Sequence, residues 1–174
     1  MVHEVVIIGG GFGGVRVAKI LSRWSAGWRN KNLHITLIDK SRYHTFHPNL
    51  YEVAAAHLPE AFGHIPVDYV NLKSAAIYPL EEIFLDDLNV TVLDDEVLNI
   101  DFKARKILLK NSPPKNYDFL VVGTGSETNY FNITNLNATA LPLKNFFDAL
   151  MIRNSIDEAF VRLPKNRNFL VANF

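Results

Sequence analysis

The stretch Val5-Val-Ile-Ile-Gly-Gly-Gly-Phe-Gly-Gly14 decides the fold of this chain. Residues 3–8 are a short β-branched run that stops at glycine, as a buried parallel strand does. From Phe12 to Trp24 the apolar residues recur at helical spacing, which predicts a helix. Residues 33–39 form a second apolar strand. Strand, glycine turn, helix and strand make one βαβ unit with a right-handed crossover. The polar residues expected on the outer face of the helix are Arg16, Lys19, Ser22 and Arg23.

The glycines of this turn satisfy the pattern G-x-G-x-x-G at Gly9, Gly11 and Gly14. The first glycine allows a tight turn, the second lets backbone approach a pyrophosphate, and the third lets the helix pack on the strand. The helix N-terminus offers free N–H groups and a partial positive charge to phosphates. Asp39 ends the second strand, where a carboxylate accepts hydrogen bonds from ribose hydroxyls. The pattern predicts a dinucleotide site, serves NAD and FAD alike, and has a purely structural turn as its alternative.

The rest of the chain supports an α/β fold, because it contains a further buried strand that is followed by glycines. Residues 118–122 form a buried strand that ends in Gly-Thr-Gly. Before it, three short alternating runs predict an antiparallel meander, which is expected in a flavin domain rather than in a plain NAD domain. The fold class is therefore α/β, a Rossmann-like FAD/NAD(P)-binding domain with a parallel sheet and a three-stranded antiparallel meander. The runs of the meander are 90–93, 97–101 and 105–109; helices are expected around 50–57, 78–86 and 143–162, and a last strand at 169–171.

Composition excludes several classes of function. The chain has 174 residues, enough for about one domain, and its 18 basic residues balance 18 acidic ones. No charge excess favours nucleic acid or an anionic membrane as partner. The absence of cysteine excludes a disulfide scaffold, a thiolate zinc site and a cysteine nucleophile within this chain. Neither a targeting segment nor an apolar run of about 18 residues is visible, so we expect a cytoplasmic location.

Five segments give the chain a family resemblance. It resembles the N-terminal, FAD-binding part of type II NADH dehydrogenases, the single-subunit NADH:quinone oxidoreductases. Two of the segments are shared across the whole superfamily, and three are more specific to this family. The segments are Val5 through Gly14, Ile35-Thr-Leu-Ile-Asp-Lys40, Tyr43-His-Thr-Phe-His-Pro-Asn-Leu-Tyr-Glu-Val-Ala54, Tyr117 through Phe131, and Asp148-Ala-Leu-Met-Ile-Arg-Asn154.

The resemblance implies FAD as cofactor, NADH as substrate and a quinone as electron acceptor. It places the pyrophosphate at residues 11–14 and Gly125, the adenosine ribose at Asp39, the adenine near Val97, and the flavin end near the loop through His47. Since the isoalloxazine ring is the reactive centre, no catalytic side chain and no metal are expected. The implied cofactor-binding residues are Gly9, Gly11, Phe12, Gly13, Gly14, Asp39, Lys40, His47, Pro48, Val97, Thr124 and Gly125.

The sequence also departs from the family pattern. No glycine follows Gly125, so a second glycine fingerprint for NADH is missing, and no Gly-Asp pair occurs anywhere. We therefore expect residues 1–165 to be an incomplete FAD-binding domain and residues 166–174 to begin a missing NADH-binding domain. The quinone pocket and a peripheral contact with the inner face of the membrane would belong to a missing C-terminal segment. A homodimer stays open, as do a non-catalytic dinucleotide-binding module and another FAD-dependent pyridine nucleotide reductase.

Other side chains have simpler interpretations. The histidines of the middle segment lack an acidic ligand pattern and are interpreted as loop residues, not metal ligands. Two acidic runs lack the spacing of a calcium loop and are interpreted as solvated turns. Two adjacent aromatic residues are expected to face the core. These residues are His44, His47, His57 and His64; Asp86-Asp87 and Asp94-Asp95-Glu96; and Phe146 and Phe147.

Overall fold

The computed structural model of this chain describes residues 2–27, 32–56 and 69–162. The chain divides into two compact units, and each is described by itself. The first unit comprises Met1–Thr45 and Ile77–Glu127, and the second comprises Phe46–Ala76 and Thr128–Phe174. Within the described residues, no helix is both long and apolar enough to cross a membrane.

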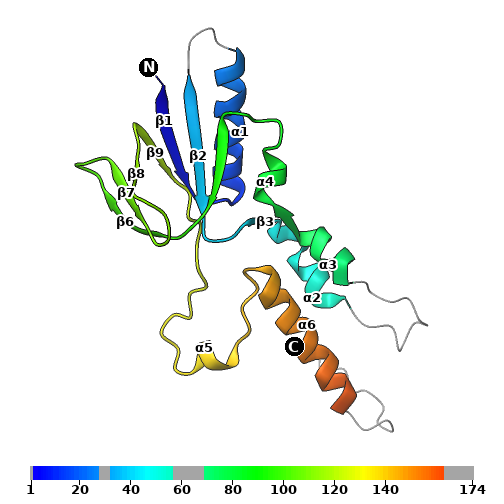
Figure 1. Ribbon diagram of the computed structural model, residues 1–174. Helices are drawn as coiled ribbons and strands as arrows, with labels where there is room; N and C mark the ends of the chain where they lie inside the picture. Colours follow the sequence, from blue (N-terminus) through cyan, green and yellow to red (C-terminus); the bar gives the residue numbers. More distant parts are fainter. Residues whose placement is uncertain (1, 28–31, 57–68, 163–174) are drawn as a thin grey trace. The chain divides into compact units, whose positions relative to one another are not determined.

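A four-stranded parallel sheet forms the centre of the first unit (Figure 1). Its order is β5 (Val90–Asp94), β2 (Leu33–Asp39), β1 (His3–Ile8) and β9 (Phe119–Val122). Ile8 is paired with Ile38 of β2 on one side and with Val122 of β9 on the other. The carboxyl ends of β1, β2 and β9 therefore meet at one edge of the sheet, where a ligand binds in open α/β folds.

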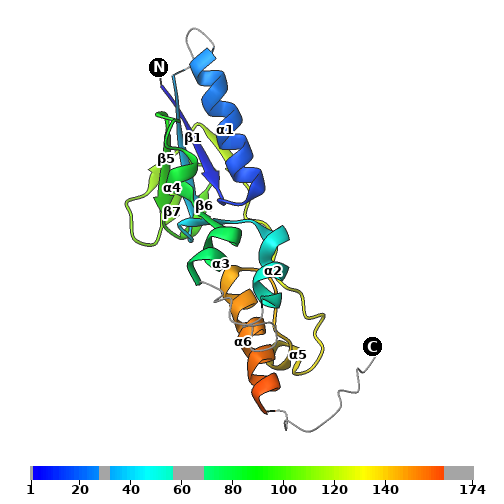
Figure 2. The same ribbon diagram turned by 90° about the vertical axis from the view of Figure 1, so that its right-hand side faces the viewer.

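Both faces of this sheet are covered, because the side chains of β1 alternate between two cores. Val5 and Ile7 pack with α1 (Phe12–Gly27) and with Leu80 of α4 (Leu80–Ile83). Val6 and Ile8 pack on the opposite face, against the small antiparallel sheet. That sheet consists of β6 (Val97–Asp101), β7 (Lys106–Leu109) and β8 (Lys115–Asn116). Figure 2 shows α1 and the small sheet on opposite sides of the parallel strands.

A short ribbon follows the second strand. It pairs β3 (Tyr43–Thr45) with β4 (Ile77–Pro79) in antiparallel fashion, so that His44 lies opposite Tyr78. The backbone amide of Leu80 donates to the carbonyl of Arg42 at 2.9 Å, which continues the ribbon into α4. The ribbon therefore joins the end of β2 to the helix face of the sheet.

The second unit is helical in its described part. It contains the 3-10 helix η1 (His47–Asn49) and the helices α2 (Leu50–Ala55), α3 (Tyr69–Ala76), α5 (Leu136–Thr139) and α6 (Phe146–Arg162). The side chain of Asn49 donates to the carbonyl of Ala75 at 2.8 Å, and Nε of Arg153 donates to the carbonyl of Ala56 at 2.6 Å. The second bond fixes α6 to the end of α2.

The predicted fold class is confirmed, but several elements differ from expectation. Residues 90–94 belong to the parallel sheet as β5, and the meander is instead made of β6, β7 and β8. The segment expected as a helix at 78–86 begins as strand β4 and keeps only one helical turn, α4. The predicted strand at 169–171 lies outside the described residues, and the domain division at 165 stays a prediction.

Two expectations about helix faces are also wrong. Ser22 of α1 is only 5% exposed, and its hydroxyl donates to Oδ1 of Asn89 at 2.7 Å instead of pointing to solvent. Helix α6 begins at Phe146, because Asn145 caps it: Oδ1 of Asn145 accepts a hydrogen bond from the amide of Asp148 at 3.0 Å, and Oδ2 of Asp148 accepts one from the amide of Asn145 at 3.1 Å. Phe146 is buried as expected, whereas Phe147 is 70% exposed.

Candidate dinucleotide-binding turn

The glycine turn after β1 is held by backbone hydrogen bonds at the carboxyl edge of the sheet. The amide of Gly9 donates to the carbonyl of Ile38 at 2.8 Å, and the amide of Gly123 donates to the carbonyl of Ile8 at 2.7 Å. A Cβ atom at Gly9 would collide with the carbonyl of Gly123, and one at Gly14 would collide with the carbonyl of Gly9. Gly9 also has a φ of +107°, which disfavours any side chain. These two glycines are required by close backbone approach.

The middle of the turn differs, because Gly11 and Gly13 face open space. A Cβ atom built on either glycine has no other atom within 4 Å. Gly11 stands at the start of α1, where its carbonyl accepts the first helical hydrogen bond from the amide of Val15 at 3.0 Å. The amides of the first helical turn have no partner within the helix and carry a partial positive charge. This open, donor-rich side fits a pyrophosphate, which needs close approach to backbone N–H groups.

Asp39 connects the end of β2 to the glycine turn. Its Oδ2 accepts a hydrogen bond from the amide of Gly10 at 2.5 Å, and its Oδ1 accepts one from the amide of Ser41 at 2.7 Å. A carboxylate offers about four lone-pair positions, so two of them stay available to further donors. Asp39 can therefore hold the turn and still accept hydrogen bonds from ribose hydroxyls. The sequence predicted the second role and missed the first.

A second glycine turn lies against the first. It follows β9 and consists of Gly123, Thr124 and Gly125, of which Gly125 has a φ of +74°. The backbone of Gly123 and Thr124 lies beside Gly9, and the space around Gly125 is open. The structure thus brings the predicted residues of both glycine segments together, although they are far apart in the sequence.

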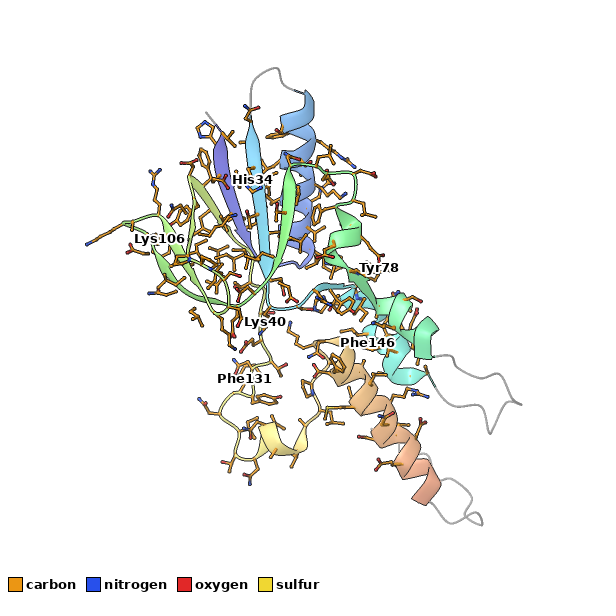
Figure 3. All side chains as sticks on the ribbon, viewed as in Figure 1. His34, Lys40, Tyr78, Lys106, Phe131 and Phe146 are labelled. Carbon is orange, nitrogen blue, oxygen red and sulfur yellow. The ribbon has the colours of Figure 1, made fainter. Side chains whose placement is uncertain are left out.

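The end of β5 forms the other border of the turn. The amide of Asp95 donates to the carbonyl of Asp39 at 3.0 Å, and Val97 packs nearby in the core under the small sheet. Lys40 follows the end of β2 and is exposed (Figure 3). A hydrogen bond from Lys110 to Glu96, at 2.7 Å, holds the pKa of the Glu96 carboxyl below its ordinary value, and the charges of Lys110 and Lys40 add to this effect.

The interpretation of the acidic runs as solvated turns is wrong for Asp87, whose side chain is only 11% exposed and accepts a hydrogen bond from Nζ of Lys19, and for Asp95. The side chain of Asp95 is only 3% exposed and accepts hydrogen bonds from the amides of Glu96, at 2.7 Å, and Asn111, at 3.1 Å. A hydrogen bond from Ser112, together with these amides, holds the pKa of Asp95 below its ordinary value. Asp95 therefore fixes the loop that leads from the parallel sheet into the small sheet.

His44 is the residue that sequence reasoning missed at this site. It is only 7% exposed, and its Nδ1 lies 2.8 Å from the carbonyl oxygen of Gly10. The interpretation of His44 as a loop residue is therefore wrong. A single histidine has no periodicity that would reveal such a contact, and its place in the segment 43–54 was the only signal available.

The remaining predicted residues fall elsewhere. His47 and Pro48 form η1 in the second unit, and their role at the flavin end stays a prediction. His57 and His64 lie outside the described residues. Among the residues that the structure describes, no group of three histidine or acidic side chains could hold a metal ion.

Comparison with known proteins identifies the family of this chain. A sequence model described as pyridine nucleotide-disulphide oxidoreductase matches residues 3–163. The chain belongs to this family. It is 36% identical over 162 residues to the type II NADH:quinone oxidoreductase NdhA of Mycobacterium tuberculosis, covering 91% of this chain and 30% of the relative. It is 30% identical to the type II NADH:quinone oxidoreductase of Staphylococcus haemolyticus, covering 94% of this chain and 36% of that relative.

These relatives confirm the resemblance to type II NADH dehydrogenases, and the chain spans about a third of their length. Two solved structures share the fold of this chain. A sulfide:quinone oxidoreductase from Aquifex aeolicus superposes with a TM-score of 0.72 at 22% identity, covering 92% of this chain and 33% of that one. NDH2 from Plasmodium falciparum superposes with a TM-score of 0.69 at 23% identity, covering 96% and 31%.

Proposed function

We propose that this chain is the FAD-binding part of an NADH:quinone oxidoreductase. The observation that carries the proposal is the open side of the turn at Gly11 and Gly13, which lies at the start of α1 and next to the carboxylate of Asp39. A dinucleotide needs this combination, because its pyrophosphate requires backbone donors and its ribose requires an acceptor. Family membership and the relatives named above support FAD as the dinucleotide.

Different residues of the first unit would contact different parts of the cofactor. Amides of the first turn of α1, from Gly11 to Gly14, would hold the pyrophosphate, with Thr124 and Gly125 on its other side. Asp39 would accept the hydroxyls of the adenosine ribose, and Lys40 and Val97 would border the adenosine. In the second unit, His47 and Pro48 would contact the flavin end.

When bound, FAD supplies the two-electron redox chemistry that side chains lack. The chain itself contributes backbone donors, one carboxylate and the exclusion of side chains from the phosphate site. Its sequence holds no cysteine, so a thiol relay within this chain is excluded. Hydride donation by NADH, electron transfer to a quinone, a peripheral position on the inner face of the membrane and a homodimer are proposals for the whole protein.

Visible absorbance after gel filtration tests the proposal. The purified chain is incubated with FAD and separated from free nucleotide, and we expect oxidised-flavin bands to elute with the protein. Gly11→Val is the matched control, because its side chain would fill the open side and should abolish the bands. A folded chain that stays colourless, as judged by circular dichroism, would contradict the proposal.

A second experiment separates this function from the alternatives that share the same turn. If the chain retains FAD, NADH is added without oxygen and bleaching of the flavin bands is followed, then a soluble quinone is supplied to restore them. Bleaching followed by recovery supports the proposed oxidoreductase. If NADH does not bleach the retained flavin, as expected of a chain without a second glycine fingerprint, the flavin is reduced by light with EDTA before the quinone is supplied. A reduced flavin that no acceptor reoxidises favours a non-catalytic dinucleotide module, and recovery only with another acceptor favours a different reductase.

A further inference from the structure

We propose that His44 is a positioning residue of the glycine turn and that it aims the amide of Gly11 at the bound phosphates. This inference rests on the proposed dinucleotide site, and nothing in the family resemblance assigns a role to this side chain. Its basis is the contact between Nδ1 of His44 and the carbonyl of Gly10, at 2.8 Å in a buried setting.

Gly10 is anchored from both sides. Its amide donates to Oδ2 of Asp39, and its carbonyl faces His44. The first bond fixes the peptide plane before its Cα atom, and the second fixes the plane after it. Glycine has the widest backbone freedom of any residue, so these two side chains select one conformation among the many that Gly10 can adopt.

The second anchor controls the direction of the neighbouring amide. The carbonyl of Gly10 and the N–H of Gly11 belong to one planar trans peptide and point in opposite directions. With the carbonyl held by His44, the N–H of Gly11 points away from His44. Gly11 borders the open side of the turn, so this N–H is placed in advance to donate to an anion there.

His44 is itself held in place. It lies on β3 opposite Tyr78 of β4, and its ring meets the ring of Phe12 edge to face, with centroids 5.0 Å apart and planes at 89°. A carbonyl only accepts hydrogen bonds, so Nδ1 must carry the hydrogen and Nε2 of the neutral ring is left without one. The tautomer of His44 is therefore a consequence of the proposal that can be measured.

Substitutions that place the hydrogen-bond donor at the position of Nδ1 or one atom farther along the side chain test the positioning role of His44. The amide nitrogen of asparagine branches from Cγ, as Nδ1 does, whereas that of glutamine corresponds to Nε2. We expect His44→Asn to keep the dissociation constant of FAD within about threefold of the unaltered chain, and His44→Gln and His44→Leu to raise it about tenfold or more. Equal affinities for the asparagine and glutamine variants, at matched unfolding midpoints, would overturn the proposal.

Nitrogen-15 spectra of the unaltered, ligand-free chain separate this proposal from the proposed function. We expect the imidazole hydrogen of His44 on Nδ1 at neutral pH. A hydrogen on Nε2 with a bare Nδ1 would overturn the positioning role whether or not the chain binds FAD. The expected tautomer in a chain that binds no FAD would instead contradict the proposed function and leave the anchor of Gly10 standing.

Discussion

The two glycine turns at the carboxyl edge of the parallel sheet use glycine for different reasons. In the first turn, residues 9–14, Gly9 and Gly14 have no room for a side chain because backbone atoms lie too close. In the second turn, residues 123–125, Gly123 has ordinary contacts, and only the positive φ of Gly125 requires glycine. The first turn is restricted by space and the second by backbone conformation.

The comparison also separates two kinds of glycine within the first turn. Gly9 and Gly14 allow strand and helix to pack closely. Gly11 and Gly13 instead face open space, and no packing contact requires glycine at either position. Glycine within a helix such as α1 lowers stability relative to alanine by up to about 1 kcal/mol. Gly13 has no packing reason to be glycine, which supports the proposed phosphate site on the open side. Four predictions follow, ordered by their effect on the free energy of unfolding.

Gly9→Ala should have the largest effect. The new methyl group would meet the carbonyl of Gly123 and would also sit at a φ of +107°, so we expect a loss of about 3 kcal/mol or more in the free energy of unfolding. Urea unfolding followed by circular dichroism measures the loss. Gly123→Ala is the matched control and should stay within about 0.5 kcal/mol, because its added atom has only ordinary contacts. Similar losses in both variants would contradict the close approach at Gly9.

Gly125→Ala should have an intermediate effect, because conformation alone opposes it. The residue has a φ of +74° and open space around it, so we expect a loss of about 1 kcal/mol in the free energy of unfolding. Gly125→Asn should lose less, since asparagine tolerates the left-handed conformation better than alanine does. The same urea titrations measure both variants. An asparagine variant less stable than the alanine variant would show that φ is not the determining property.

Lys19→Met, a substitution outside both turns, should lower the free energy of unfolding by an amount that depends on pH, unlike the glycine substitutions. Burial opposes ionisation of Asp87, but hydrogen bonds and the charge of Lys19, whose Nζ lies 2.5 Å from Oδ2, hold the pKa of Asp87 below its ordinary value. The contribution of ionised Asp87 to the free energy of unfolding is therefore complete above its ordinary pKa and is lost as pH falls through the lowered pKa of the folded chain. We expect Lys19→Met to lose about 1 kcal/mol at pH 7 and to approach the unaltered chain near pH 3.

The glycine variants provide the control for this prediction. Neither Gly9→Ala nor Gly125→Ala changes a titratable contact, so their losses in the free energy of unfolding should be equal at pH 7 and pH 3. A Lys19→Met difference that is equally independent of pH would contradict the assignment of the stabilisation to the ion pair with Asp87.

Gly11→Ala should have the smallest effect on stability and a clear effect on binding. Its methyl group would enter open space, so we expect the free energy of unfolding to change by less than about 0.5 kcal/mol. The same group would stand where the pyrophosphate approaches, and the dissociation constant of FAD should rise about tenfold or more. Fluorescence quenching of FAD measures the affinity. Gly13→Ala should weaken binding in the same way, while its free energy of unfolding should rise by up to about 1 kcal/mol because Gly13 lies within α1. Unchanged affinity in both variants would mean that the open side does not bind the phosphates.

The sequence predicted the first βαβ unit and the glycine turn because both depend on local patterns. Residues 3–8 and 33–39 carry continuous apolar runs, and Asp39 stands at the expected end of its strand. The parallel pairing of β5 was not predicted, because its short alternating sequence is equally typical of a meander strand. Only its long-range pairing with β2 decides between the two. The two-residue strand β8 is too short to carry any periodic signal.

The side-chain anchors of the site could not be predicted for a related reason. Asp39 was expected to bind a ribose, yet its bond to Gly10 depends on how closely β2 and the turn approach each other. His44 and Ser22 are buried through contacts with residues distant in the sequence, Gly10 and Asn89. Such contacts result from the packing of complete layers, and the type of a single polar residue does not reveal them.

The pairing of β1 with β9 has a consequence for how the protein is made. Gly9 is synthesised early, but the backbone that borders it comes from Gly123, and the two segments meet only when β9 joins β1. A nascent chain that ends before β9 therefore contains the whole glycine fingerprint and only one border of the turn. Closure over such a long separation is slow compared with the local βαβ unit. On the ribosome, the glycine turn is completed only after most of this chain has been translated.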